Sequence, residues 1–485
     1  MKKSFLLKML ALLLVVMLIA ACARNGGNEA PPAGDAEEVT EEAAEEATEE
    51  VAEEVTEEGE IVDEVVEVEY YEPGEQVLIR YFHLWGDDPA QNYRHEPLAR
   101  FLENNPHVTV EESFAAHDEF LGTMLPVLIA ADELPEFFTL HMSHFVAAQT
   151  TGQLYDWTPA LNADPEWGDA FLVDLFEEVA TATGKYGLPS QMLAHNATFY
   201  NSEILASVGF DSFPEECWDT WMDMNQLLLD AGYIPVVMGN GAGWMGSSLL
   251  EVLIARTAGG EWKRSILDGT GTWEDPGVIW ALELYLDIYN RGFFNVDSNS
   301  VDMVSSRQYY FQGLGAQYLE GSWTVGAFLE GPEEIINVTR IATLPEVAGG
   351  LGAPRAITGG CAWHYSASSR IAGTGALEEA VIALAKELTS LETAANMLEI
   401  GILPGINADL VTFDTSGLHP LYLSLYAMIA NAGAVYPMHA VQTNSSVLEH
   451  FTRGIHELAL GVITPEELAA STQQVYLDTY TPPFD

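Results

Sequence analysis

The sequence predicts an α/β fold whose folded part divides into two lobes. From residue 77 onward, short runs rich in β-branched and aromatic residues alternate with runs of helical character. This alternation is typical of parallel strands covered by helices on both faces. The chain has 485 residues, of which 48% are hydrophobic. That composition is ample for a large core in two lobes or domains.

The first elements follow one another closely. A strand is predicted over residues 77–85 (VLIRYFHLW), and the helix after it ends at the sequence NNP, residues 104–106. A second strand covers HVTVEESF, a helix runs from about residue 118 to 131, and a third strand covers FFTL, residues 137–140. Three strands separated by helices in this order favour a parallel arrangement.

The rest of the chain continues the alternation less regularly. Strands are predicted over HNATFYN, over residues 234–238 and over GGCAWHYSASS. Residues 276–290 predict an amphipathic helix, because Ile279, Leu282 and Leu286 recur on one stripe. Further helices are predicted at 203–208, 218–231, 377–388, 392–400 and in two C-terminal segments, the second starting at TPEE.

The N-terminus carries the features of an export signal. Three lysines precede an apolar run, residues 10–19, that is too short to span a membrane stably, and small residues then lead to Cys22. This order resembles the lipobox of bacterial lipoproteins. The resemblance implies a signal peptide over residues 1–21 and a diacylated Cys22 that tethers the protein to a membrane. The alternative is an ordinary secretory signal with an incidental cysteine.

Residues 22–75 are predicted to form a disordered acidic stalk. The run EEVTEEAAEEATEEVAEEVTEEGE repeats paired glutamates, and residues 35–75 hold 20 acidic and no basic side chains. Such a segment repels itself and cannot bury apolar surface, so we expect it to lift the folded part off the membrane. A transient helix and a tail that binds cations or a basic partner are the alternatives.

Charge and motifs exclude several function classes. The formal net charge is −55, with 18 Lys and Arg against 73 Asp and Glu, so nucleic acid and anionic lipid surfaces are not expected partners. Cys217 and Cys361 either pair or stay as free thiols. We predict no metal, no cofactor and no enzymatic activity, because G-x-S-x-G, H-E-x-x-H and Walker A sequences are missing from the chain.

Five segments of the chain resemble one known family. They are GQLYDWTPAL, the long stretch from GKYGLPSQM to NQLLLDAG, YFQGLGAQYLEGSW, GILPG and LGVITPEELAAS, in that order. The sequence thereby resembles the extracellular solute-binding proteins of family 1, sugar-type binding lipoproteins that feed ABC importers. The resemblance covers about residues 76–485. Leu314 and Gln317 depart from its usual Lys and Met.

The resemblance implies a two-lobe periplasmic-binding-protein-like fold of type II, with a ligand cleft between discontinuous lobes. Crossovers near Ser190, Arg340 and Thr389 would make residues 76–190 and 340–389 the first lobe, and 191–339 and 390–485 the second. It also implies a monomer held at the extracytoplasmic face of the cell membrane. That monomer would deliver a small solute, most simply a mono- or oligosaccharide, to the permease subunits of an ABC transporter.

A sugar offers hydroxyl groups and flat C–H faces, so its binder needs planar polar side chains and aromatic platforms. Such side chains are expected in loops after strands, at the edge where α/β sheets bind ligands. For each, the structural alternative is a helix cap or a core position. The candidates are Trp85, Asp87, Asp88, His141, Gln191, His195, Asn240, Trp244, Trp323, Trp363 and His439.

Two other functions fit parts of the sequence. A carbohydrate-active enzyme needs a pair of carboxylates, but with 73 acidic residues such a pair is always available and carries no information. A surface scaffold or adhesin fits the acidic stalk but leaves the aromatic loops unexplained. Turnover of an oligosaccharide would favour the enzyme, and the lack of any small-ligand effect would favour the scaffold.

Overall fold

The computed structural model describes residues 70–84, 93–172, 175–176, 179–181, 183–195, 197–416, 418–439 and 443–480. The chain separates into two units, Met1–Glu67 and Val68–Asp485, and the account below concerns the second. The predicted signal peptide, Cys22 and the stalk up to residue 69 lie outside the described residues.

The first sheet has the strand order β2-β1-β3-β11-β4. Its first three members along the chain are parallel, as predicted, whereas β11 runs antiparallel to both β3 and β4. The bounds are β1 (Val77–His83), β2 (Val108–Phe114), β3 (Phe137–His141), β4 (Leu188–Pro189) and β11 (Trp363–Ala367).

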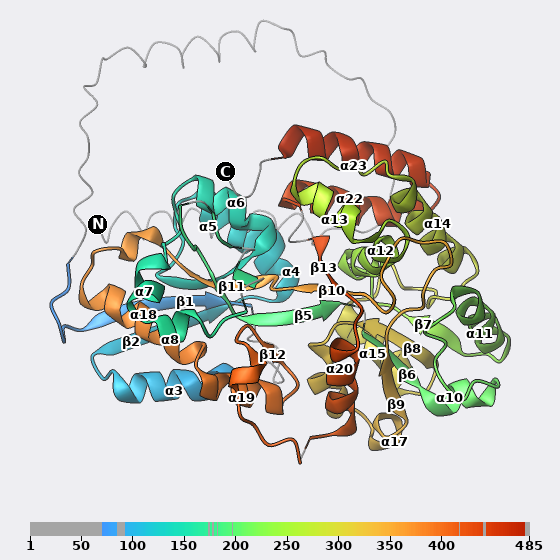
Figure 1. The fold of residues 1–485 in the computed structure, drawn as a ribbon, viewed down its shortest axis with the longest axis horizontal. Helices are drawn as coiled ribbons and strands as arrows, with labels where there is room; N and C mark the ends of the chain where they lie inside the picture. The colour runs from blue at the N-terminus through green and yellow to red at the C-terminus, as the bar shows by residue number, and fades with distance from the viewer. Residues whose placement is uncertain are drawn as a thin grey trace, which may run out of the picture. The chain divides into compact units, whose positions relative to one another are not determined.

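The burial of these strands explains their place in the sheet. On β1, Val77, Ile79 and Tyr81 are buried while the residues between them are exposed, and β3 is buried along its whole length. A strand buried on both faces belongs in the middle of a covered sheet. Figure 1 shows α3 and α6 on opposite sides of these strands. The first core therefore fills both sides of the sheet.

Two further sheets carry the remaining strands. The second has the order β12-β5-β10-β13 and the third β7-β8-β6-β9. The bounds are β5 (Gln191–His195), β6 (Ala197–Asn201), β7 (Ile234–Val237), β8 (Gly315–Glu320), β9 (Thr339–Ala342), β10 (Ile357–Gly360), β12 (Leu403–Pro404) and β13 (Val435–Pro437). A second set of buried residues packs on the third sheet and its helices.

The second sheet is the layer through which the chain passes between the first and third sheets. β4, β5 and β6 follow one another and lie in the first, second and third sheets respectively. Ser190, where we expected the first crossover, sits between β4 and β5. Arg340, near the second expected crossover, lies in β9 and pairs there with Tyr200 of β6. The chain returns to the first sheet only through β10 and β11.

The helices agree closely with the periodic patterns. The predicted helix at 118–131 is a continuous run of three segments, α4 (His117–Glu119), a π-helix (Phe120–Met124) and α5 (Leu125–Ala130). Others confirmed within two residues are α11 (Trp218–Asp230), α14 (Pro276–Asn290), α18 (Ala376–Leu388) and α19 (Leu391–Glu399). The TPEE signal starts α23 (Pro465–Thr479) with a capping box between Thr464 and Glu467.

The remaining helices pack around the three sheets. They are α3 (His95–Asn104), α6 (Met142–Thr150), α7 (Thr158–Ala163), α8 (Pro165–Gly168), α10 (Ser202–Ser207), α12 (Trp244–Thr257), α13 (Gly259–Leu267), α15 (Met303–Phe311), α16 (Thr324–Leu329), α17 (Glu333–Ile336), α20 (Pro420–Ala430) and α22 (Ser445–Ala459).

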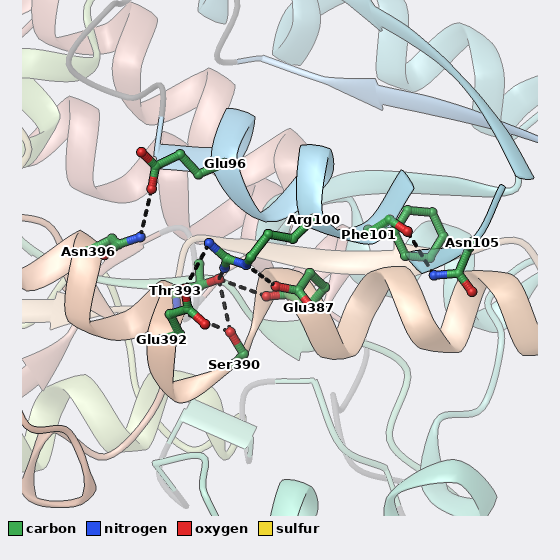
Figure 2. A network of polar contacts seen from close by, with 9 residues as sticks. All are labelled: Glu96, Arg100, Phe101, Asn105, Glu387, Ser390, Glu392, Thr393 and Asn396. Carbon is green, nitrogen blue, oxygen red and sulfur yellow. Dashed lines mark hydrogen bonds and ion pairs between the residues drawn. The ribbon is translucent and has the colours of Figure 1, made fainter. Parts of the chain in front are cut away.

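A polar network ties α3 to the junction of α18 and α19, near the third expected crossover (Figure 2). Arg100 on α3 donates from Nε to Glu387 Oε1 at 2.8 Å and from Nη2 to Thr393 Oγ1 at 3.2 Å. Its Nη1 also pairs with Glu392 Oε1 at 3.2 Å. Because one guanidinium contacts the end of α18 and the start of α19, it holds that junction against the first lobe.

Candidate functional site

Three of the predicted site residues, Trp85, Asp87 and Asp88, lie outside the described residues. Their place in the site stays a prediction. The other predicted residues are described, and they divide into residues that share one aromatic cluster and residues whose contacts are with the protein interior.

Five rings form a continuous series that we call the aromatic row: Trp363, His117, Trp244, Trp323 and His195. Neighbouring ring centres along this series are 5.7, 5.7, 6.0 and 5.4 Å apart. The row begins in the first core, to which Trp363 belongs, and reaches Trp244, which packs against the second. The structure thus brings together rings from segments far apart in sequence, between the first core and the second.

Trp323 joins the two lobes most directly. It follows β8 of the third sheet, yet its half-buried side chain packs against the first core. Its indole Nε1 donates to Glu320 Oε1 at 2.8 Å. A Cβ on Gly321 would lie 1.9 Å from the indole Cζ3 atom, so only glycine leaves room for this ring position. The ring is therefore fixed with its N–H occupied, and its faces are what it offers to a ligand.

Glu320 is itself held by a buried ion pair. Its carboxylate accepts hydrogen bonds from Arg307 Nε at 3.1 Å and Nη2 at 2.8 Å. Burial alone would lower the pKa of Arg307, but the charge and hydrogen bonds of Glu320 outweigh it and the pKa is raised. A charge pair of this kind fixes the carboxylate that orients Trp323.

Trp244 is placed by the turn that starts α12. Gly243 precedes it with φ of 83°, and a side chain there would also meet Thr452 at 2.6 Å. Asn240 is fully buried and builds the same turn. Its Nδ2 donates to Asn299 Oδ1 at 2.9 Å, and its Oδ1 accepts from the Gly246 N–H at 2.7 Å. Both atoms of the Asn240 amide thus have protein partners.

His195 ends β5 and pairs with Glu251 of α12. The distance from His195 Nδ1 to Glu251 Oε2 is 2.7 Å, and Glu251 is 3% exposed. Burial alone would raise the pKa of Glu251, but His195, His439 and Lys263 outweigh it and lower that pKa to about 2. The carboxylate therefore stays ionised at neutral pH.

His439 lies behind Glu251 and not in the aromatic row. It is 1% exposed, and its ring packs on Trp273 at 5.4 Å and Phe451 at 5.3 Å. Its backbone N–H donates to Glu251 Oε1 at 2.8 Å. Burial lowers the pKa of His439 to about 3, so the ring is neutral. Through these contacts His439 packs in the interior and holds the Glu251 carboxylate.

Two more predicted residues lie on the strands next to the row. His141 ends β3 with its ring 4.5 Å from Trp363, and its Nδ1 lies 2.7 Å from Ser143 Oγ. Burial lowers the pKa of His141 well below its usual range. Gln191 starts β5, pairs there with Pro404 and is 3% exposed. Both support the strands from which the row projects.

Sequence reasoning missed His117 and Glu251. His117 starts α4 after a loop and contacts both Trp244 and Trp363, a position that depends on the packing of the two lobes. Glu251 does carry a local signal, because it is the only charged residue in the apolar run SSLLEVLIA. A lone carboxylate in an otherwise buried helix needs a partner.

A separate hollow of about 790 Å³ lies away from the aromatic row. It is bordered by α11, α14 and residues 346–353, and none of the predicted site residues lines it. Cys217 is on its wall and is an exposed free thiol, whereas Cys361 is buried. The two cysteines therefore form no disulfide with each other in the structure.

Two kinds of feature do not occur among the residues that the structure describes. No group of three or more His, Cys, Asp or Glu side chains in this part of the chain is placed to hold a metal ion. Among the same residues, we find no helix with the length and apolar character needed to cross a membrane.

Comparison with solved structures defines the class of fold. A chitin oligosaccharide binding protein matches with a TM-score of 0.75 and 22% identity, over 83% of this chain and 98% of the other. A protein from work on xylan utilization by the thermophilic bacterium Caldanaerobius polysaccharolyticus matches with a TM-score of 0.74 and 21% identity, over 82% and 99%. A family 1 extracellular solute-binding protein from Bifidobacterium longum subsp. infantis gives 0.58 and 17%, over 84% and 100%. The chain has the two-lobe α/β fold of solute-binding proteins.

Two sequence relatives are described as extracellular-binding proteins of ABC transporters. An uncharacterised ABC transporter extracellular-binding protein of Pyrococcus horikoshii is 24% identical over 246 residues, which are 50% of this chain and 55% of the relative. A second protein of the same description and organism is 21% identical over 43% and 46%. The chain thus spans about half the length of the curated relatives it matches. No family model matches it. The resemblance to extracellular solute-binding proteins is confirmed by these relatives and by the fold.

Proposed function

We propose that this protein is the extracytoplasmic binding component of an ABC importer and that its ligand is a mono- or oligosaccharide. The observation that carries the proposal is the aromatic row, in which half-buried Trp244 and Trp323 lie 6.0 Å apart where the lobes meet. Flat indole faces bind the C–H faces of a sugar ring, and such sites favour domain junctions. Structural neighbours include a chitin oligosaccharide binding protein and a sugar transporter in complex with stachyose, which supports the same ligand class.

Two carboxylates beside the row, Glu320 and Glu251, support binding over turnover. Glu320 is held by Arg307 and Trp323, and Glu251 by His195 and the His439 N–H. Glycoside hydrolysis needs one carboxylic acid that donates a proton and a second that attacks or activates water. Both of these carboxylates are committed to protein donors, so neither serves as that acid.

The anchor and the partners belong to the same proposal. Lipidation at Cys22 would hold the protein at the extracytoplasmic membrane surface, with residues 22–75 as a spacer. The folded part would act as a monomer that passes the sugar to permease subunits. Cys22→Ala should move the protein from the membrane fraction to the medium or soluble fraction. Unchanged membrane retention of this variant would rule out the lipid anchor.

A thermal-shift screen tests the ligand class. Triacetylchitotriose, xylotriose, stachyose and D-galactose are added separately to the purified protein, with glycine betaine as a control that is not a sugar. A sugar that binds only the folded state increases the free energy of unfolding by mass action, by about 2.7 kcal/mol at one hundred times its Kd. The melting temperature rises as a result. Release of shorter sugars during incubation, or no shift with any sugar, would contradict the proposal.

A further inference from the structure

We infer that Glu251 is a positioning residue, which holds the His195 ring so that its Nε2 atom hydrogen-bonds a ligand hydroxyl beside Trp323. The inference rests on the proposed function and specifies one polar contact of the site. Glu251 itself lies in the second turn of α12 and contacts the ligand only through His195.

The carboxylate is held from two sides. Its Oε2 is 2.7 Å from His195 Nδ1, and its Oε1 accepts from the His439 backbone N–H at 2.8 Å. A carboxylate with a donor on each oxygen cannot rotate freely. Because an ionised carboxylate only accepts hydrogen bonds, the hydrogen of the His195 ring must be on Nδ1. In the neutral ring Nε2 is then an acceptor for a hydroxyl.

The His195 ring lies at the end of the aromatic row and contacts Trp323. It meets the Trp323 ring edge to face, with centres 5.4 Å apart and planes at 82°. The His195 side chain is 12% exposed, compared with 4% for Glu251. In the part of the chain that the structure describes, no hydrogen bond is formed by Nε2. A hydroxyl that bonds this atom would belong to a sugar ring lying beside Trp323.

Two buried hydroxyl groups lie on the elements next to His195 and Glu251. Ser247 lies one turn before Glu251 on the face of α12 that also carries Trp244. Thr358 of β10 is the register partner of His195 on β5, so the two side chains share one face of the sheet. Ser247 Oγ and Thr358 Oγ1 are buried and lack a partner among the described residues. Buried hydroxyls without partners mark hydrogen-bonding capacity that a ligand or water fills.

The alternative is that Glu251 has only a structural role, which predicts a different result for its replacement. Lys263 donates from Nζ to Pro437 O at 3.0 Å, and its charge also acts on Glu251. If Glu251 only balances this charge and ties α12 to β13, its loss lowers stability without acting through His195. The experiment must therefore separate a ligand effect that passes through His195 from a general one.

The first measurement needs no ligand. The ¹⁵N chemical shifts of the His195 ring, recorded on the folded wild type at neutral pH, report which nitrogen carries the hydrogen. We expect a hydrogen on Nδ1 in the wild type and loss of that preference in Glu251→Gln, whose amide can also donate. A neutral His195 with its hydrogen on Nε2 in the wild type would overturn the inference and leave sugar binding unaffected.

The second measurement is a double-mutant cycle on affinity. The probe is whichever of triacetylchitotriose, xylotriose, stachyose and D-galactose gives the largest thermal shift, titrated by calorimetry. Glu251→Gln should weaken binding about tenfold in the wild type and leave it unchanged in the His195→Ala background. Equal weakening in both backgrounds would show a general structural role and reject the inference. If no probe binds the wild type, the proposed function fails and the inference falls with it.

The chain offers a matched control. Glu112 of β2 forms a similar pair with His83, with His83 Nε2 2.9 Å from Glu112 Oε1. This pair lies in the first sheet, where the His83 ring packs against Tyr81 and Phe114. Glu112→Gln removes a carboxylate from a histidine in the same way, so it should leave sugar affinity at the wild-type value. A loss of affinity here as large as that of Glu251→Gln would reject the specific role.

Discussion

Replacing Trp323 with alanine tests the aromatic row where it joins the two lobes. The change removes the indole that packs against the first core and loses the hydrogen bond to Glu320. Truncation of an aromatic anchor of this kind costs about 1–3 kcal/mol of binding free energy, or roughly 5- to 150-fold in Kd. The stability cost is smaller, about 1–2 kcal/mol, because Trp323 is half-buried and Glu320 keeps both bonds to Arg307.

Isothermal titration with the sugar found in the thermal screen measures the change in Kd, and a denaturant titration measures stability. Trp280→Ala is the matched control, because Trp280 is also half-buried but lines the separate hollow beside α11 and α14. We expect a large loss of affinity for Trp323→Ala and wild-type affinity for Trp280→Ala. A folded Trp323→Ala variant that binds sugar as tightly as the wild type would refute the platform role.

Three further predictions follow from the same contacts. Gly321→Ala should weaken sugar binding about as much as Trp323→Ala, because its Cβ would displace the indole; unchanged titration curves would argue against a fixed ring. The pKa of Glu251 is lowered from 4.5 to about 2, so this carboxylate stabilises the fold above about pH 4.5. That contribution, on the order of 3 kcal/mol, is lost as the pH falls toward 2. Glu251→Gln should therefore flatten the stability profile between these pH values, which urea titrations at each pH would show. A thiol reagent should modify Cys217 in the native protein and reach Cys361 only after unfolding, as mass spectrometry would reveal; equal modification of both would contradict the buried position of Cys361.

Local patterns were sufficient for most helices and for the first three strands. The stripe of α14 and the capping signal of α23 depend on residues within one or a few turns, so periodicity identifies them directly. The glycines shortly before Trp244 and Trp323 also marked these tryptophans as candidates. The site role of both tryptophans remains a prediction that the variants above test.

Strand pairing and the burial of single side chains could not be predicted from the sequence. The passage from β9 through β10 to β11 depends on which strands pair, and short strands of four or five residues do not specify their partners. His439 follows a strand, as a site residue would, but the packing of Trp273 and Phe451 around its ring buries it. Neighbours distant in the chain decide burial of this kind.

By itself, the sequence determined the α/β class, the acidic N-terminal segment, the resemblance to solute-binding proteins and the aromatic residues from which a sugar site can be built. These properties follow from composition, periodicity and the order of short segments. Only the tertiary structure decided that His117 completes the row, that Glu320 and Gly321 set the ring of Trp323, and that Glu251 holds His195. The physical reason is that hydrogen bonds and steric fit act between atoms a few ångströms apart, whereas the residues that supply them are separated by up to 246 positions, from His117 to Trp363.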